Sequence, residues 1–253
     1  MSIAQQLTRI LTAKGDIRTA LVAEGYDIPE NASIELMAKI VESYNHEFVD
    51  LGLRSNGKKI LFATCNIGAE TPYDVGDYFA WGEHSKRYDT NPGSQTFIQD
   101  NCPFYDTTNE VYTKYNDTDG KMELDLEDDI AHILWGGNWR MPTQSEMEFL
   151  ASANVSVTTL VLTSGLRSYM VSGHGDYAGK AISFVESGYC KDGGKVESIY
   201  DTAVFATREL ASYLKSKCKT VTMGYRYYDV MFSTGENARS NGIPVRPVLE
   251  IPE

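Results

Sequence analysis

The chain has 253 residues, of which 42% are hydrophobic and 23% charged, so it has the composition of a globular protein with ample material for a core. A chain of this length suggests one large domain and a small one. Its formal net charge is −12, from 23 basic and 35 acidic residues. That balance argues against nucleic acid as a partner, because binding phosphates requires a basic surface.

The N-terminus and the cysteines bear on the compartment. The start of the chain, MSIAQQLTRI, lacks the basic start, apolar core and cleavage site of a secretory signal, and no apolar run approaches the length of a membrane span. The cysteines lie far apart without a C-x-x-C pair, which argues against a zinc knuckle. We therefore expect no membrane span and free thiols in a reducing compartment, with disulfides left open.

Residues 1–46 predict two helices that form a module of their own. One face of the first helix follows a heptad spacing, interrupted once by Lys14, with apolar residues at Ile3, Leu7, Ile10, Ile17 and Leu21. Gly25 suits the cap that ends this helix, and Asn31 or Ser33 can cap the next one. Two interpretations stay open: a helical hairpin packed on itself or on the main domain, and a bundle that makes the chain a homo-oligomer.

Part of this module resembles the short helical modules of phage and prophage tail and fibre proteins. The matching residues are Ala13, Lys14, Asp16, Ile17, Ala20, Leu21, Gly25, Ile28 and Pro29. The resemblance implies an attachment role for residues 1–46. We therefore expect a protein that is cytoplasmic before it is assembled into a phage particle or exported by another route.

Residues 47–253 predict an α+β domain. Short strands are expected at 60–65, 155–162, 180–184 and 227–232, and helices at about 126–134 and 143–153. A long irregular loop is expected from Tyr88 to Asp119. The stretch 135–150, WGGNWRMPTQSEMEFL, carries two tryptophans and a glycine pair before a capping box of Thr143 and Glu146. We expect this stretch to fix a corner of the core, with Trp135, Trp139 and Arg140 in structural roles.

Several motifs in this domain resemble the Fibrobacter succinogenes major paralogous domain family, which is related to formylglycine-generating-enzyme-type domains. They are FVDLGL (48–53), NIGA (66–69), GDYFAWGE (76–83), WRMPT (139–143) and PVRPV (244–248). The resemblance implies a C-type-lectin-like domain with short, mostly antiparallel strands and two helices, and it places Trp81 and Arg246 among the structural residues. The resemblance weakens over residues 183–241.

No cofactor is expected, although one acidic run leaves calcium as an alternative. The run comprises Asp117, Asp119, Glu123, Asp125, Glu127, Asp128 and Asp129. Its spacing does not fit an EF-hand, and a solvated helix N-terminus explains it better. The histidines show no metal-ligand spacing, so no metal residue is assigned.

We expect no enzymatic activity, with a cysteine-dependent oxidase as an alternative that the family resemblance implies. Cys190 and Cys218 are the only cysteines late in the chain, as such an oxidase would need. They do not stand in the motif of that family, and no neighbouring histidine supports a thiolate.

Tyrosine and arginine are frequent between residues 200 and 239, and these side chains often dominate binding surfaces. The expected ligand-binding residues are Arg208, Glu209, Tyr225, Arg226, Tyr228, Asn237 and Arg239. Of these, we expect Arg208, Arg226, Tyr228, Asn237 and Arg239 to be exposed and to converge on one surface. Strand alternation places Tyr225 and Tyr227 on one face, and Arg226 and Tyr228 on the other.

The sequence thus favours a non-enzymatic, adhesin-like protein that binds a cell-surface protein or a glycan through C-terminal loops. Lectin-like domains of this kind occur in the variable proteins that retroelements diversify in phages and bacteria, and a phage-like helical module fits that arrangement. The alternative from another class is a structural surface protein without a specific ligand.

Overall fold

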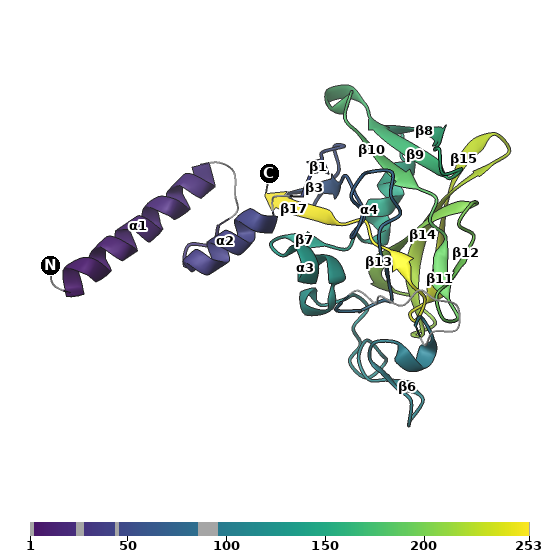
Figure 1. The fold of residues 1–253 in the computed structure, drawn as a ribbon, viewed down its shortest axis with the longest axis horizontal. Coiled ribbons are helices and arrows are strands. Elements are labelled where there is room, and N and C mark those ends of the chain that lie inside the picture. The colour runs from purple at the N-terminus through teal and green to yellow at the C-terminus, as the bar shows by residue number, and fades with distance from the viewer. Residues whose placement is uncertain (1–2, 24–27, 44–45, 86–95, 253) are drawn as a thin grey trace.

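The computed structural model describes residues 3–23, 28–43, 46–85 and 96–252. The expected cap at Gly25 and the start of the loop expected from Tyr88 lie outside these residues. Two helices, α1 (Ile3–Ala23) and α2 (Ile34–Ser43), precede a compact body that contains the strands (Figure 1). The prediction of two N-terminal helices is therefore confirmed. Ser33, and not Asn31, caps α2, because its hydroxyl accepts the backbone N–H of Leu36 at 3.0 Å.

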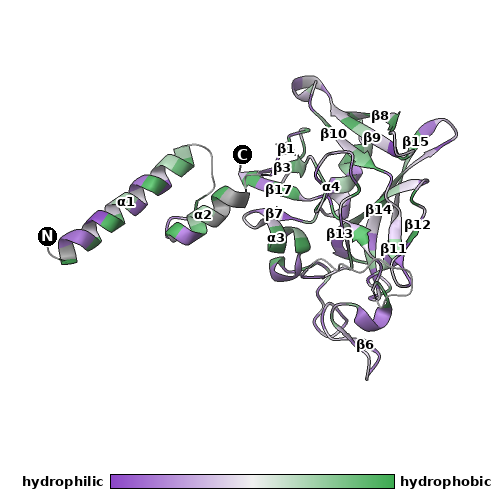
Figure 2. Ribbon diagram, in the orientation of Figure 1, coloured by the Kyte–Doolittle hydropathy of each residue, from purple (hydrophilic) through white to green (hydrophobic). Residues whose placement is uncertain are grey.

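The helix α1 extends away from the body (Figure 1), and hydrophobic and hydrophilic residues are interspersed along its ribbon (Figure 2). It is held near its C-terminal end, where Leu21 packs against a small cluster that includes Met37. Nearby, the guanidinium of Arg18 donates to the carbonyl oxygens of Ile28 at 3.0 Å and Pro29 at 3.1 Å. In the first part of α1, the side chains of Ile3, Leu7 and Ile10 are all more than half exposed.

The central sheet joins the two ends of the body. Its strands are β1 (Phe48–Val49), β2 (Arg54–Ser55), β3 (Lys58–Ala63), β7 (Trp139–Arg140) and β17 (Val248–Pro252). The order is β1-β3-β17-β7, and β2 pairs with β3. Val248 lies opposite Phe62 of β3 and also opposite Arg140 of β7. The last strand is thus the one that links the start of the body to its middle.

Two three-stranded antiparallel sheets enclose the main core. One contains β8 (Val155–Val161), β9 (Arg167–Gly173) and β10 (Ala181–Val185). The other contains β13 (Thr202–Leu210), β14 (Lys217–Arg226) and β15 (Asp229–Ala238), with β14 in the middle. Their inner faces supply buried residues such as Tyr169, Phe184, Phe205 and Met223 to one apolar cluster with Phe62. This core holds the two sheets at fixed positions.

Three small antiparallel pairs complete the strands. They are β4 (Tyr78–Phe79) with β16 (Ile243–Pro244), β5 (Tyr105–Asp106) with β6 (Val111–Tyr112), and β11 (Tyr189–Lys191) with β12 (Lys195–Glu197). The body is therefore a mixed α/β fold of mostly small antiparallel sheets and few helices, which confirms the α+β prediction at that level. Within the described residues, no helix is both long and apolar enough to cross a membrane.

The helices of the body are shorter than the sequence predicts. The expected helix at 126–134 is a 3-10 turn, η2 (Leu126–Asp128), followed by α3 (Ile130–Trp135). The expected helix at 143–153 is α4 (Gln144–Glu148) followed by η3 (Phe149–Ala151). Further 3-10 turns are η1 (Gln99–Asn101) and η4 (Gly175–Tyr177).

The capping box at the start of α4 is confirmed. The Thr143 hydroxyl accepts the backbone N–H of Glu146 at 3.2 Å, and the Glu146 carboxylate accepts the backbone N–H of Thr143 at 2.8 Å. The same carboxylate forms two hydrogen bonds with the Arg140 guanidinium, at 2.7 and 2.5 Å. Residues close in sequence thus contribute directly to the corner between β7 and α4.

Candidate functional site

The residues that the sequence predicts to be structural lie inside the body of the protein. Trp81, Trp139, Arg140 and Arg246 are buried, and Trp135 is half-buried. Trp139 meets Trp135 edge-on, with 4.9 Å between ring centroids. This placement agrees with the structural roles expected for them, which themselves stay predictions.

The expectation that Arg239 is exposed is wrong. Its side chain is 0% exposed, and its guanidinium lies 4.0 Å from the ring centroid of Tyr112 and 4.7 Å from that of Trp81. It donates to the carbonyl oxygens of Tyr115 at 3.3 Å and Lys215 at 3.2 Å. The chain turns inward after β15, so Arg239 serves the core and has no surface for a ligand.

Arg208 and Glu209 are also engaged by the fold. The Arg208 side chain is only 15% exposed and donates to the carbonyl oxygen of Leu124 at 2.6 Å, so the expected exposure is wrong here too. Glu209 accepts hydrogen bonds from the Lys219 ammonium at 3.1 Å and from the backbone N–H of Gln144 at the start of α4. Both residues join β13 to its neighbours.

The expected convergence on one surface is wrong as well. Arg226 lies opposite Asp229 at one end of the β14–β15 ladder, whereas Ala238 lies opposite Lys217 at the other end. Nine strand positions at about 3.4 Å each separate the two ends by about 30 Å. Half-buried Asn237, whose side-chain oxygen accepts from Asn241 at 2.5 Å, is therefore far from Arg226.

The β14–β15 hairpin instead presents two neighbouring tyrosines at its tip. Tyr227 is 94% exposed and Tyr228 is 95% exposed. They form a two-residue turn between Arg226 and Asp229, with φ of +52° and +66°. Because the strand ends at Arg226, the alternation expected for Tyr227 and Tyr228 does not hold, and both rings reach solvent. A turn with positive φ at both positions normally takes asparagine and glycine.

Two other turns lie beside this hairpin. Arg167, at the start of β9, stacks over the ring of Tyr225 at 5.2 Å, and it lies opposite Val161 at the end of β8. Tyr200, which is 63% exposed, precedes Thr202, the residue paired with Gly224 of β14. In Figure 1 the labels β8, β9 and β15 accordingly lie together at one end of the body.

We call this end of the two sheets the tyrosine surface. It comprises Val161, Arg167, Tyr200, Tyr225, Arg226, Tyr227 and Tyr228. Its exposed tyrosines offer flat, rigid rings with hydroxyl groups, its arginines offer directional donors, and Val161 adds exposed aliphatic area. Such a set can stack on a ligand and hydrogen-bond to it.

Three expected residues, Tyr225, Arg226 and Tyr228, belong to the tyrosine surface. Sequence reasoning did not select Val161 or Arg167, because packing of two sheets brings them there from distant positions. A recognisable signal existed for Tyr227, which lies with Tyr228 in the shortest turn between two strand-like runs.

The acidic run does not offer an open cation site. Lys114 places its ammonium 3.1 Å from both Asp125 and Glu127, and it also donates to Asp128. Burial alone would raise the pKa of Asp128, but hydrogen bonds from Lys114 and Tyr115 hold it below its usual value. The lysine thus supplies the positive charge that calcium would bring. Asp129 instead caps α3, since it accepts the backbone N–H of Ala131 at 3.0 Å.

The two cysteines late in the chain are not activated as nucleophiles. Neither forms a disulfide, and burial raises the pKa of Cys190 and of Cys218 to about 12. Both therefore remain thiols near neutral pH, whereas a nucleophile or a redox-active residue needs the thiolate.

Comparison of this chain with protein families, with characterised proteins and with solved structures finds no match.

Proposed function

We propose that this is a non-enzymatic ligand-binding protein whose body displays the tyrosine surface. The observation that carries the proposal is the pair Tyr227–Tyr228, fully exposed in a left-handed turn. Such backbone conformations cost bulky residues about 1–2 kcal/mol each, and strained residues cluster at functional sites. Folding alone would favour cheaper residues at this turn.

The neighbouring groups suit a cell-surface protein or a glycan as the ligand. Tyr200 and Arg226 are exposed beside the tip, and Arg167 and Tyr225 form its base. Aromatic faces stack on sugar rings or on protein side chains, and arginines supply directional hydrogen bonds. The net charge of −12 disfavours nucleic acid.

We further propose a C-type-lectin-like scaffold, as the sequence resemblance to the Fibrobacter family implies. What supports it is the short antiparallel sheets, the pairing of β3 with β17, and the buried Trp139 and Arg246 of the matching motifs. A variable receptor-binding protein encoded by a phage, a prophage or a bacterium is the context that fits such a body behind helices α1 and α2.

The test of ligand binding uses the variant Tyr227→Asn/Tyr228→Gly. Asparagine and glycine are the preferred pair for this turn, so the variant removes both rings and keeps the hairpin. We expect wild type to bind defined glycans on an array or the surface of host-type cells, and the variant to lose at least tenfold in affinity. The matched control is Tyr213→Ala, which removes a ring that is 93% exposed in the loop between β13 and β14, away from the tip. Equal binding by all three proteins would refute the proposal.

The helices α1 and α2 are proposed to attach the body or to join copies of the chain. The specific observation is that heptad residues lie open on α1: Ile3 is 77%, Leu7 55%, Ile10 57% and Ile17 43% exposed. Light scattering on the full chain and on a shortened chain that begins at Phe48 tests self-association. A multiple of the chain mass is expected for the first and a single mass for the second. Equal single masses would leave attachment or an intramolecular hairpin as the role.

A structural protein without a specific ligand is the alternative function. For melting temperature and self-association, this alternative predicts the same results as the ligand-binding proposal does. It differs in predicting no binding that depends on Tyr227 and Tyr228. A cysteine-dependent oxidase is disfavoured by the raised pKa of Cys190 and Cys218, and labelling of the native protein with a thiol reagent would reveal a reactive cysteine.

A further inference from the structure

We propose that α1 assembles with copies of itself into a parallel bundle of more than two helices, roughly three or four. This inference rests on the proposed self-association and specifies the number of copies. The evidence is the type of apolar residue at each heptad position of α1, on a face that the rest of the fold leaves exposed.

The spacing of the apolar residues fixes one heptad assignment. Steps of four lead from position d to position a, and steps of three lead from a to d. Leu7, Lys14 and Leu21 therefore occupy a, while Ile3, Ile10 and Ile17 occupy d. Every apolar a position is leucine and every d position is isoleucine.

Leucine at position a with isoleucine at position d disfavours a two-stranded coiled coil. A parallel pair is favoured by β-branched residues at a and leucine at d, whereas leucine at a and isoleucine at d shifts the preference to three or four strands. The branch at Cβ restricts isoleucine to few rotamers, so it cannot adapt to the wrong packing geometry. In α1 all three d positions carry that restriction.

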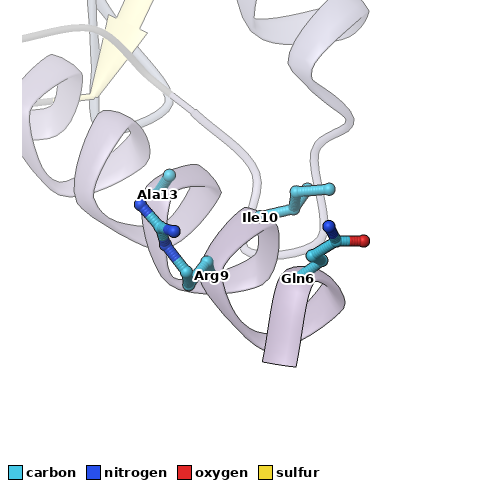
Figure 3. Close-up of a pocket in the computed structure, with 4 residues that line it drawn as sticks. All are labelled: Gln6, Arg9, Ile10 and Ala13. Carbon is cyan, nitrogen blue, oxygen red and sulfur yellow. The ribbon is translucent and has the colours of Figure 1, made fainter. Parts of the chain in front are cut away.

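The open face of α1 is also wider than a two-stranded seam. Leu11, at position e, is 67% exposed beside Leu7, and alanines occupy position g at residues 13 and 20. Figure 3 shows Ile10 and Ala13 with Gln6 and Arg9, which line a depression beside this part of α1. A broad apolar face suits a helix that contacts two neighbouring copies.

The chain itself limits which part of α1 is available. Leu21 is half-buried against the cluster of Ile28, Ala32 and Met37, and Arg18 is bonded to the loop that follows α1. The bundle therefore uses residues 3–17. Lys14 places one charge in this seam, and a charge at an a position lowers stability while it selects the register.

The decisive experiment exchanges the two residue types in the full-length chain. The variant Ile3→Leu/Leu7→Ile/Ile10→Leu/Ile17→Leu puts isoleucine at a and leucine at d, and leaves the chain mass unchanged because the residues are isomers. By sedimentation equilibrium, we expect wild type at roughly three or four chain masses and the exchanged variant at two. Lys14→Leu should tighten the wild-type assembly without changing its order.

The control Ile10→Glu keeps the helix but places a charge at the centre of the seam, and it should be monomeric. Unchanged melting of the body in each variant shows that the mass reports on α1 alone. A wild-type dimer, or an exchanged variant of unchanged order, would overturn the inference while self-association stands. A monomeric wild type at high concentration would overturn the self-association on which it rests.

Discussion

At the scale of single residues, Arg239 and Arg246 hold the body together without an acidic partner among the described residues. Arg246 donates to the carbonyl oxygens of Ala63 in β3 at 3.1 Å and Ser183 in β10 at 2.9 Å, and Arg239 donates to the carbonyl oxygens of Tyr115 and Lys215. One planar guanidinium can donate to several acceptors at once. Each of the two arginines therefore links segments that are distant in the sequence.

Trp139→Ala tests the corner that β7 and α4 form. Trp139 is 0% exposed against Trp135, Leu61 and Leu249, so removing the ring leaves a cavity. The free energy of unfolding should fall by about 3–5 kcal/mol, as measured in urea. Ligand affinity measured below the melting temperature should not change. Normal melting combined with lost binding would show that Trp139 is a binding residue instead.

Gly188→Ala and Gly165→Ala form a matched pair. Both glycines have positive φ, of +55° and +87°, so each substitution strains the backbone by about 1–2 kcal/mol. At Gly188 a Cβ would also lie 1.9 Å from the Glu197 carbonyl oxygen, whereas nothing lies within 4 Å at Gly165. We expect Gly165→Ala to melt a few degrees lower and Gly188→Ala to unfold or fail to accumulate. Similar melting of the two would rule out this clash.

At the scale of elements, different residues of the β14–β15 hairpin pack on the core and present the exposed tyrosines. Tyr225, Val230 and Phe232 pack against the main core close to the turn, and the turn beyond Arg226 carries the exposed rings. This packing therefore fixes the direction of the hairpin, while residues in the turn are free to change without a cost to the core.

The variant Tyr227→Asn/Tyr228→Gly should accordingly be more stable than wild type. Relief of the left-handed strain predicts a gain of about 1–2 kcal/mol in the free energy of unfolding at each of the two positions. Thermal melting checks this against Tyr213→Ala, for which no gain is expected. A less stable variant would mean that the two rings contribute to the fold.

At the scale of the whole molecule, local signals were predictable and long-range packing was not. Two N-terminal helices, the α4 capping box and the α+β class follow from residues close in sequence. Arg239 could not be placed, because the rings that cover it come from residues 81 and 112. Three members of the tyrosine surface were expected, but the exposure of Tyr227 depends on where β14 ends.

The fall in the stability of the fold at acid pH should depend on Asp128. Its pKa is lowered in the folded protein, so it contributes stability that is present above pH 3.8 and lost as the pH falls through the folded value. Asp128→Asn should therefore weaken the fall in melting temperature below about pH 4. Glu127→Gln is the control, because Glu127 binds the same lysine but its side chain is 76% exposed. Equal acid profiles in wild type and Asp128→Asn would contradict this role.

The position of β17 sets the order of events during synthesis. This strand is made after both β3 and β7, yet it lies between them in the central sheet. Until it leaves the ribosome, the edges of β3 and β7 face each other without their shared partner, and the core beneath them stays open. The helix α1 needs no such partner, so nascent chains on neighbouring ribosomes can meet through α1 before any of their bodies has folded. Assembly would then precede folding, and copies translated from one messenger would assemble with each other first.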